Sequence, residues 1–172
     1  MAQSSSEIQY LIDRAAIHDL LTRYFQGLDR GSPEQVRSCF TDDVRAHYDK
    51  RTPTRGVEAL IDSLQNFNAL QEGTMKITTH FMGNLNFTRI EGDVAETETN
   101  AIAFLVEPGN GAGLVAVRCL RYLDRMRREP SGWRISDRIH TLDWSCQVPA
   151  NFALTLAQRV SVLPQRTERQ AS

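Results

Sequence analysis

The sequence lacks the features that mark several large protein classes. It has 3 cysteines among 172 residues, without metal-ligand spacing, and an odd number gives no complete disulfide framework. No apolar run reaches the length of a membrane-spanning helix, and the N-terminus has no apolar signal segment. The 20 basic and 21 acidic residues are interspersed, so the formal net charge of -1 gives no nucleic-acid footprint. We therefore expect a cytoplasmic protein without nucleic-acid or membrane partners.

Motifs of cofactor-dependent and covalent catalysis are missing as well. There is no HExxH zinc motif, no serine elbow and no paired cysteines. The glycine-rich stretch 109–113 lacks the strand-to-helix context of a nucleotide site. The sequence therefore predicts no metal and no cofactor, so any chemistry falls to ordinary side chains.

The hydrophobic pattern predicts helices first and long strands afterwards. Apolar residues at helical spacing predict helices at about 8–28, 33–40 and 57–67, with Ser32 as an N-cap and Pro33 as a first helical residue. A short strand is expected at 44–48, and 49–55 is read as a loop. Long strands are expected at about 75–90, 94–107, 114–127 and 133–144, with a bend or bulge at Gly83. A short helix is expected at 151–160.

This order predicts an α+β fold in a single domain spanning residues 1–172, with a core at about 8–145 and a C-terminal tail at about 146–172. Long, evenly connected antiparallel strands favour a strongly curved sheet. Folded over the N-terminal helices, such a sheet forms a cone-shaped α+β barrel with an interior pocket.

Asp29 and His80 are the first candidates for chemistry. His80 lies within a β-branched and aromatic strand, so its ring points to one sheet face, which it shares with Thr78 and Met82. A carboxylate that reaches this ring would hold one tautomer, which makes a general base without a cofactor. Asp29 ends the first helix and Tyr24 precedes it by five residues, about 140° around an ideal helix. The two share a pocket only if Asp29 leaves helical geometry.

Each of these residues also has a purely structural interpretation. Asp29 could bond its own turn, Tyr24 could be a core aromatic, and His80 could be a packed strand histidine. The other histidines are His18, His47 and His140, and of these His47 is a candidate for the pocket mouth.

Three segments together resemble a known family. Residues 13–29, 79–84 and 132–144 are similar to the opening helix, the histidine-bearing strand and the final strand of the SnoaL-like branch of the nuclear-transport-factor-2-like (NTF2-like) superfamily. Dehydrochlorinases and dehydratases of this branch use an Asp–His dyad and an arginine on the last strand. The resemblance therefore implies catalytic roles for Asp29, His80 and Arg138, and for Tyr24 at the spacing of a dehydratase tyrosine. A further acidic residue of the dehydratase has no match in the stretch 99–103.

The pattern of residues alone leaves the arginine open. Arg118 and Arg121 fit equally well by alternation, and Arg138 could instead form a cross-strand ion pair with Asp124. Only the resemblance selects Arg138.

The leading hypothesis is a cofactor-independent lyase of dehydratase type that acts on a small hydrophobic molecule such as a polyketide, steroid, terpenoid or aromatic. The expected substrate-binding residues are Leu20, His47, Met82, Phe104 and Trp144. The alternatives are an isomerase or cyclase that uses the same residues, and a small-molecule-binding module without chemistry. An open curved sheet also predicts a homo-oligomer, a trimer or a dimer.

Overall fold

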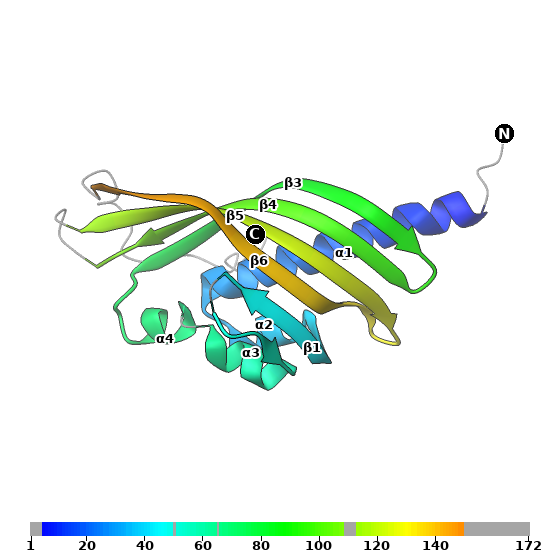
Figure 1. Ribbon diagram of the computed structural model, residues 1–172, viewed down its shortest axis with the longest axis horizontal. Helices are drawn as coiled ribbons and strands as arrows, with labels where there is room; N and C mark the ends of the chain where they lie inside the picture. Colours follow the sequence, from blue (N-terminus) through cyan, green and yellow to red (C-terminus); the bar gives the residue numbers. More distant parts are fainter. Residues whose placement is uncertain (1–4, 50, 65, 109–112, 150–172) are drawn as a thin grey trace, which may run out of the picture.

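A computed structural model describes residues 5–49, 51–64, 66–108 and 113–149. It shows a six-stranded sheet that curves over one long helix (Figure 1). In chain order the elements are α1 (Ser5–Arg30), α2 (Pro33–Arg37), β1 (Phe40–Tyr48), β2 (Thr54–Arg55), α3 (Val57–Ser63), α4 (Asn66–Gln71), β3 (Ile77–Glu91), β4 (Val94–Val106), β5 (Leu114–Glu129) and β6 (Gly132–Pro149).

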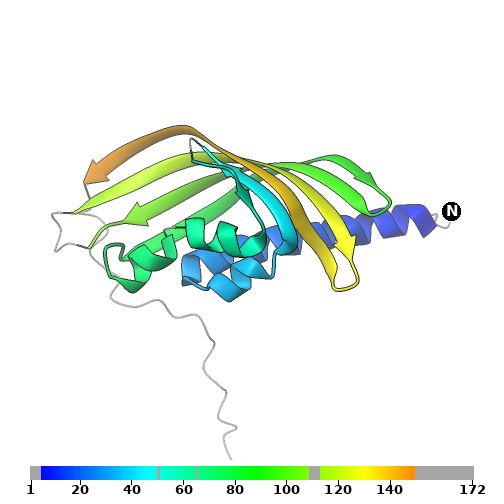
Figure 2. The same ribbon diagram turned by 60° about the horizontal axis from the view of Figure 1, so that its bottom comes forward.

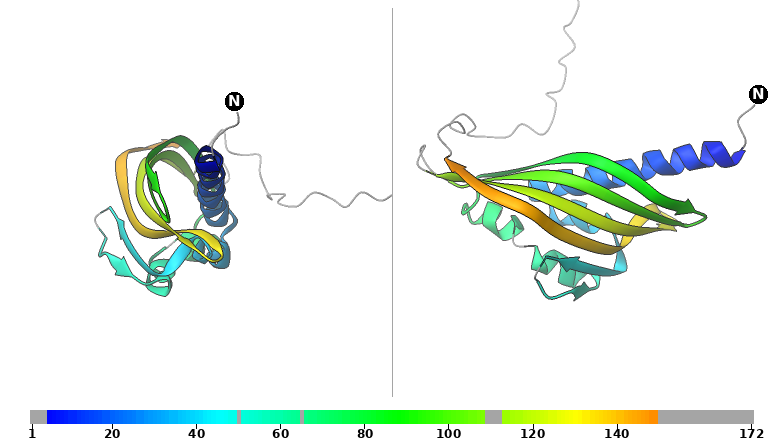
Figure 3. Two further views of the ribbon diagram at one scale, coloured as in Figure 1. Left: turned by 90° about the vertical axis from the view of Figure 1, so that its right-hand side faces the viewer. Right: turned by 45° about the horizontal axis from the view of Figure 1, so that its top comes forward.

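The strand order in the sheet is β2-β1-β6-β5-β4-β3. The strands β3 to β6 form an antiparallel meander, whereas β1 runs parallel to β6 and carries β2 at the outer edge. The sheet is not closed; it curls so that α1 lies against its concave face (Figure 3). The short helices α2 and α3 lie beside β1, and α4 continues from α3 toward the start of β3 (Figure 2). The predicted α+β class with a curved, mainly antiparallel sheet is confirmed.

The predicted elements are present with shifted boundaries. The predicted helix at 57–67 is two helices, because the chain leaves helical geometry at Leu64 (φ -84°, ψ 87°) before α4 begins. The stretch read as a loop contains the short strand β2. The strand expected at 133–144 continues to Pro149. The helix expected at 151–160 lies outside the described residues.

The end of α1 is built around two glycines and a serine. Gly31 has φ +63°, which ends the helix in the left-handed conformation, and Ser32 caps α2 by accepting a hydrogen bond from the Gln35 amide. A Cβ atom at Gly27 would lie 2.8 Å from Val36 Cγ2, so the glycine lets α2 pack directly against α1. Ser32 and Pro33 hold the predicted positions. This packing fixes the last turn of α1, where Asp29 lies.

The strand register arranges the residues of the concave face in rows that run across the strands. His80 pairs with Ala103 and Ala103 with Arg118, so these three positions lie side by side on β3, β4 and β5. Further along the same face, beyond the row of Ala101 and Leu120, one row brings together Thr99, Tyr122 and His140, and the next Thr97, Asp124 and Arg138. Ala101 and Ala103 are small, so they leave open space above β4 between the larger side chains.

Two bulges change which face of the sheet the following residues occupy. The register shift between Met82 and Leu85, expected near Gly83, turns Leu85 toward the core, whereas strict alternation would put it on the face opposite Met82. A second shift, between Ile135 and Asp137, puts Ile135 and Arg138 on the same buried face, whereas strict alternation would separate residues three apart. None of the described helices is long and apolar enough to span a membrane.

Candidate active site

Asp29 and His80 meet at the end of α1. The ring nitrogen Nδ1 of His80 lies 2.6 Å from Asp29 Oδ1, and the His80 backbone N–H donates to Asp29 Oδ2 at 3.0 Å. The His80 side chain is only 3% exposed, and its ring is stacked on Phe25 with centroids 5.8 Å apart. A carboxylate can only accept, so it holds the tautomer with the proton on Nδ1 and leaves the Nε2 lone pair as a base.

Asp29 reaches His80 without leaving the helix, which corrects one expectation. The helix α1 continues through Arg30, so Asp29 remains helical. Tyr24 and Asp29 do not need a common helix face, because His80 on β3 bonds Asp29 and also lines the cavity that Tyr24 lines. Asp29 bonds the ring from behind, whereas Tyr24 lines the cavity itself.

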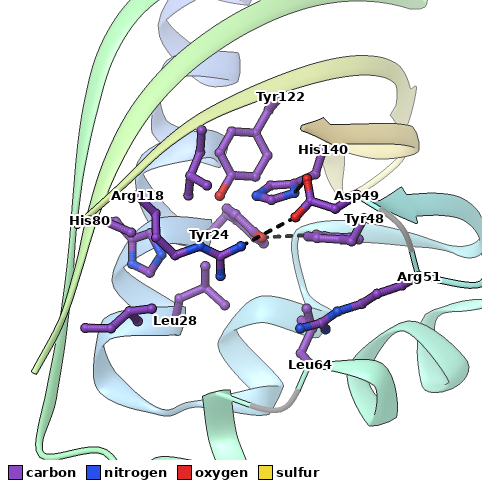
Figure 4. A pocket seen from close by; sticks show the side chains of 13 residues that line it. Tyr24, Leu28, Tyr48, Asp49, Arg51, Leu64, His80, Arg118, Tyr122 and His140 are labelled. Atoms are coloured by element: carbon purple, nitrogen blue, oxygen red, sulfur yellow. Dashed lines mark hydrogen bonds and ion pairs between the residues drawn. The ribbon is translucent and has the colours of Figure 1, made fainter. Parts of the chain in front are cut away.

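His80 opens onto a cavity inside the cone (Figure 4). The cavity has a volume of about 50 Å³, which is room for only one or two waters. It is lined by Tyr24, Leu28, Tyr48, Asp49, Arg51, Leu64, His80, Ala103, Leu105, Arg118, Leu120, Tyr122 and His140. A ligand of drug size fills several hundred Å³, so binding one requires lining side chains to move.

Three tyrosines shape the inner wall of the cavity. The hydroxyls of Tyr24 and Tyr48 are hydrogen-bonded at 3.1 Å, and the Tyr122 ring packs edge-on against Tyr24. Burial raises the pKa of Tyr24 well above its usual range, and the neighbouring hydroxyls of Tyr48 and Tyr122 add to the shift. Tyr24 therefore faces the cavity as a hydroxyl group that keeps its proton.

A second set of polar side chains, Arg118, Asp49 and His140, lines the same cavity. Arg118 Nη2 and Asp49 Oδ2 are 3.4 Å apart, and Asp49 Oδ1 lies 3.4 Å from His140 Nδ1 (Figure 4). Burial lowers the pKa of His140 to about 4, against the pull of Asp49, so its ring is neutral at neutral pH. Its ring is stacked on Tyr48 with centroids 4.9 Å apart. In the sequence His140 was another histidine to consider beside His80, and the fold brings both to one cavity.

Arg138 does not line this cavity, which corrects the substrate-facing role expected for it. Its side chain is 0% exposed and donates to Asp124 through Nε and Nη2, both at 2.7 Å. Burial opposes the charge, yet the Asp124 carboxylate holds the pKa of Arg138 well above its usual range. The guanidinium stacks over Tyr24 at 4.1 Å and Tyr122 at 4.7 Å, so it supports the tyrosine wall from behind. The alternative cross-strand pair with Asp124 is the one present.

The five expected substrate-binding residues are absent from the lining of this cavity. Leu20 is 0% exposed in the core, and Met82 packs against that core. His47 is exposed on β1, where it pairs with Ile139, itself 49% exposed. Phe104 and Trp144 lie on the convex face of the sheet, where Phe104 contacts Phe81 edge-on and Trp144 is 51% exposed. A further register shift opposite Cys119 and Leu120 turns Trp144 outward.

Sequence reasoning left Arg118 open as an alternative and missed other parts of the polar lining. Tyr122 alternates with Arg118 on β5, with the buried Leu120 between them, so an alternation count could have found Tyr122 as well. Asp49 carried no such signal: it directly follows β1 and has φ +50°, an uncommon conformation for a residue other than glycine. No cluster of three or more His, Cys, Asp or Glu side chains suited to a metal ion occurs among the described residues.

The comparison with protein families matches residues 9–139 to the SnoaL-like domain. The chain belongs to the SnoaL-like domain family. It is 26% identical over 139 residues to an uncharacterized protein of Mycobacterium tuberculosis, a match that covers 81% of this chain and 91% of the relative. The SnoaL-like resemblance of the three segments is thereby confirmed.

Solved structures show the same fold. A candidate scytalone dehydratase from Novosphingobium aromaticivorans superposes with a TM-score of 0.70 at 17% identity, covering 80% of this chain and 88% of that one. A type 2 hexachlorocyclohexane dehydrochlorinase also gives a TM-score of 0.70, at 18% identity, covering 83% and 93%. At these identities the likeness establishes the cone-shaped α+β fold and no activity.

Proposed function

We propose that this SnoaL-like protein is a cofactor-independent lyase that eliminates water from a small hydrophobic substrate. The observation that carries the proposal is the Asp29–His80 pair, a histidine fixed in one tautomer at the wall of an interior cavity. A histidine held in this way meets the geometric requirement for a general base. The candidate dehydratase and the dehydrochlorinase with the same fold, both named for eliminations, support this reaction class.

His80 starts the reaction in this mechanism. Its Nε2 lone pair takes a proton from a carbon next to an activating group, and the positive charge that forms on the ring is stabilised by Asp29 at 2.6 Å. A positioned base of this kind contributes about 10²–10⁴-fold to the rate.

Tyr24 completes the elimination. Its hydroxyl, kept protonated by burial and joined to Tyr48 at 3.1 Å, donates a proton to the departing hydroxyl of the substrate. A C–H bond and a C–O bond break, a carbon–carbon double bond forms and water leaves. The proton taken by His80 then returns to Tyr24 through the cavity, so both residues regain their starting protonation states. The elimination itself changes no oxidation state and needs no reductant or oxidant.

The experiment is a product-mass assay on a panel of hydrophobic β-hydroxy carbonyl compounds. The proposal requires the loss of one water in at least one compound, and that loss must disappear in His80→Ala with the fold retained. Products of unchanged mass would identify an isomerase or cyclase instead. A His80→Ala variant that keeps most of its turnover would remove the mechanism.

The convex face of the sheet supports the expected homo-oligomer. Phe81, Ile102, Cys119 and Trp144 form one cross-strand row on it, and Phe104 and Val117 lie in the neighbouring row. A contiguous apolar patch of this kind marks an interaction surface, and we propose that a second copy of the chain covers it. We also propose a cytoplasmic location, which suits the three free thiols.

A further inference from the structure

The cavity has a positively charged wall that the elimination mechanism does not use. Among the residues that the structure describes, two arginines, Arg51 and Arg118, line it, and Asp49 is the one carboxylate. His140 is neutral, since burial lowers its pKa to about 4. The wall therefore carries an excess of positive charge, although the chain as a whole has a net charge of -1.

Arg118 is well placed to meet a ligand that His80 also contacts. Arg118 and His80 lie in the same cross-strand row, separated only by Ala103. Strands are spaced at about 4.8 Å, so the two backbone positions are roughly 10 Å apart. The small side chain of Ala103 leaves the space between them open, and Figure 4 shows the Arg118 guanidinium extending into the site.

Arg118 is weakly engaged in the present arrangement. Its side-chain hydrogen bond among the described residues is the 3.4 Å contact with Asp49, which is long for a charge-assisted bond of about 2.7–2.9 Å. The Arg118 side chain is 30% exposed and the Asp49 side chain 25% exposed, so neither is locked in the core. The cavity is also too small for a substrate until lining side chains move.

Asp49 is held where a ligand's own carboxylate would sit. It has φ +50°, and its backbone N–H donates to the His140 carbonyl at 2.9 Å, which aims the side chain at the cavity. Its second oxygen faces His140 Nδ1, a buried nitrogen that makes no hydrogen bond to the described residues. An acid group that entered would find the arginine and this nitrogen already arranged around a carboxylate.

We propose that Arg118 is a substrate-anchoring residue that binds the carboxylate of a hydrophobic acid, and that Asp49 is the internal counter-ion which the ligand displaces. This inference rests on the proposed function and names its substrate class. The entering carboxylate replaces Asp49 as the partner of Arg118, and the displaced Asp49 side chain, already 25% exposed, turns toward water, so no arginine is left buried and unpaired. The reacting carbon of the anchored acid then lies on the His80 side of the cavity.

The test measures binding by titration calorimetry, so that it does not depend on turnover. The probes are 2-naphthoate and its uncharged amide, 2-naphthamide. Wild type is expected to prefer the acid, and Arg118→Gln to bind it at least tenfold more weakly with little change for the amide. Asp49→Asn is expected to bind the acid several-fold more tightly, because the competing carboxylate is gone. Asparagine tolerates the left-handed backbone at this position.

Matched controls separate this inference from the lyase proposal. Arg121→Gln removes an arginine from the convex face of the same strand, where Arg121 pairs with Asp143, and should leave both affinities unchanged. His80→Ala should abolish turnover but retain the preference for the acid. Equal binding of acid and amide in wild type, or unchanged acid binding in Arg118→Gln, would overturn the anchor and leave the lyase intact. Weaker acid binding in Asp49→Asn would overturn the displaced counter-ion.

Discussion

Asp29 accepts two hydrogen bonds from one residue, a ring bond from His80 Nδ1 at 2.6 Å and a backbone bond from the His80 N–H at 3.0 Å. The carboxylate is therefore fixed to β3 through the main chain as well as through the ring. The ring has little freedom to rotate, because Phe25 is stacked against it. The pair couples the last turn of α1 to the first long strand.

Asp29→Asn is expected to abolish most turnover while leaving the fold intact. The asparagine oxygen can still accept the backbone bond, but its NH₂ group would face Nδ1 and favour the tautomer protonated on Nε2. The expected loss in kcat is about 10²–10⁴-fold. Steady-state kinetics and thermal unfolding of the same sample would check it. A loss of activity that only parallels a loss of folded protein would contradict this role.

Tyr24→Phe and Tyr48→Phe test the proton donor. Tyr24→Phe removes the donor itself, whereas Tyr48→Phe removes only its 3.1 Å partner, so the first is expected to lower kcat about 10²-fold and the second roughly tenfold. Because the two hydroxyls act as a unit, the double variant should be no slower than Tyr24→Phe. Additive losses in kcat would show that the hydroxyls act separately.

Arg138→Met is expected mainly to lower the free energy of unfolding. The variant leaves Asp124 buried without its partner, and breaking a buried pair costs about 3–5 kcal/mol. Replacing both residues, as Arg138→Met with Asp124→Leu, should cost much less than the sum of the single variants. Denaturant unfolding of the three variants measures the difference. A single variant as stable as wild type would contradict the structural role.

His140 is expected to make the free energy of unfolding depend on pH, in a direction that its pKa determines. Its pKa is lowered to about 4 in the folded protein from an ordinary value of 6.5, so between these values the unfolded chain binds more protons. Stability should therefore fall as the pH drops from 6.5 to 4, and His140→Phe should flatten that slope. Chemical unfolding at a series of pH values would show it. An unchanged slope in the variant would assign the dependence to other groups.

Trp144→Glu is expected to separate the protein into monomers. Trp144 is 51% exposed within the apolar row on the convex face, so a charge there opposes association. Ile12→Glu on α1, a residue 54% exposed, is the control. Light scattering after size exclusion measures the mass of each. Dissociation by Ile12→Glu alone would place the interface on α1 instead.

The sequence predicted the elements well and the sheet faces poorly. Helical spacing and turn residues identified α1 and the four long strands, because each signal is local. Alternation predicts which face a strand residue occupies only as far as the next bulge, and the irregularities near Gly83, Ser136 and Asp143 each reset the count. Trp144 was misplaced for this reason.

The contact between the end of α1 and β3 could be predicted from the sequence. The side chains whose position depends on the register of the strands could not. The pairing of Asp29 with His80 was implied by the resemblance to the SnoaL-like segments, because each residue alone also had a structural interpretation. The choice between Arg118 and Arg138 depends on which row of the sheet lies beside His80, and a row is a property of the pairing of β3, β4 and β5. The position of the Asp49 side chain depends on the backbone conformation of the turn after β1, which the pattern of polar and apolar residues does not predict.

The parallel pairing of β1 with β6 also sets the order in which the molecule can be completed. Ala46 can pair only after Arg138 has been made, so this contact closes a loop of about half of the chain. During synthesis the meander of β3 to β5 can form on α1 while Tyr48 and Asp49 still lack the strand that places them. The polar wall of the cavity is thus expected to be the last part to assemble on the ribosome, and the meander should already resist proteolysis in nascent chains that end before β6.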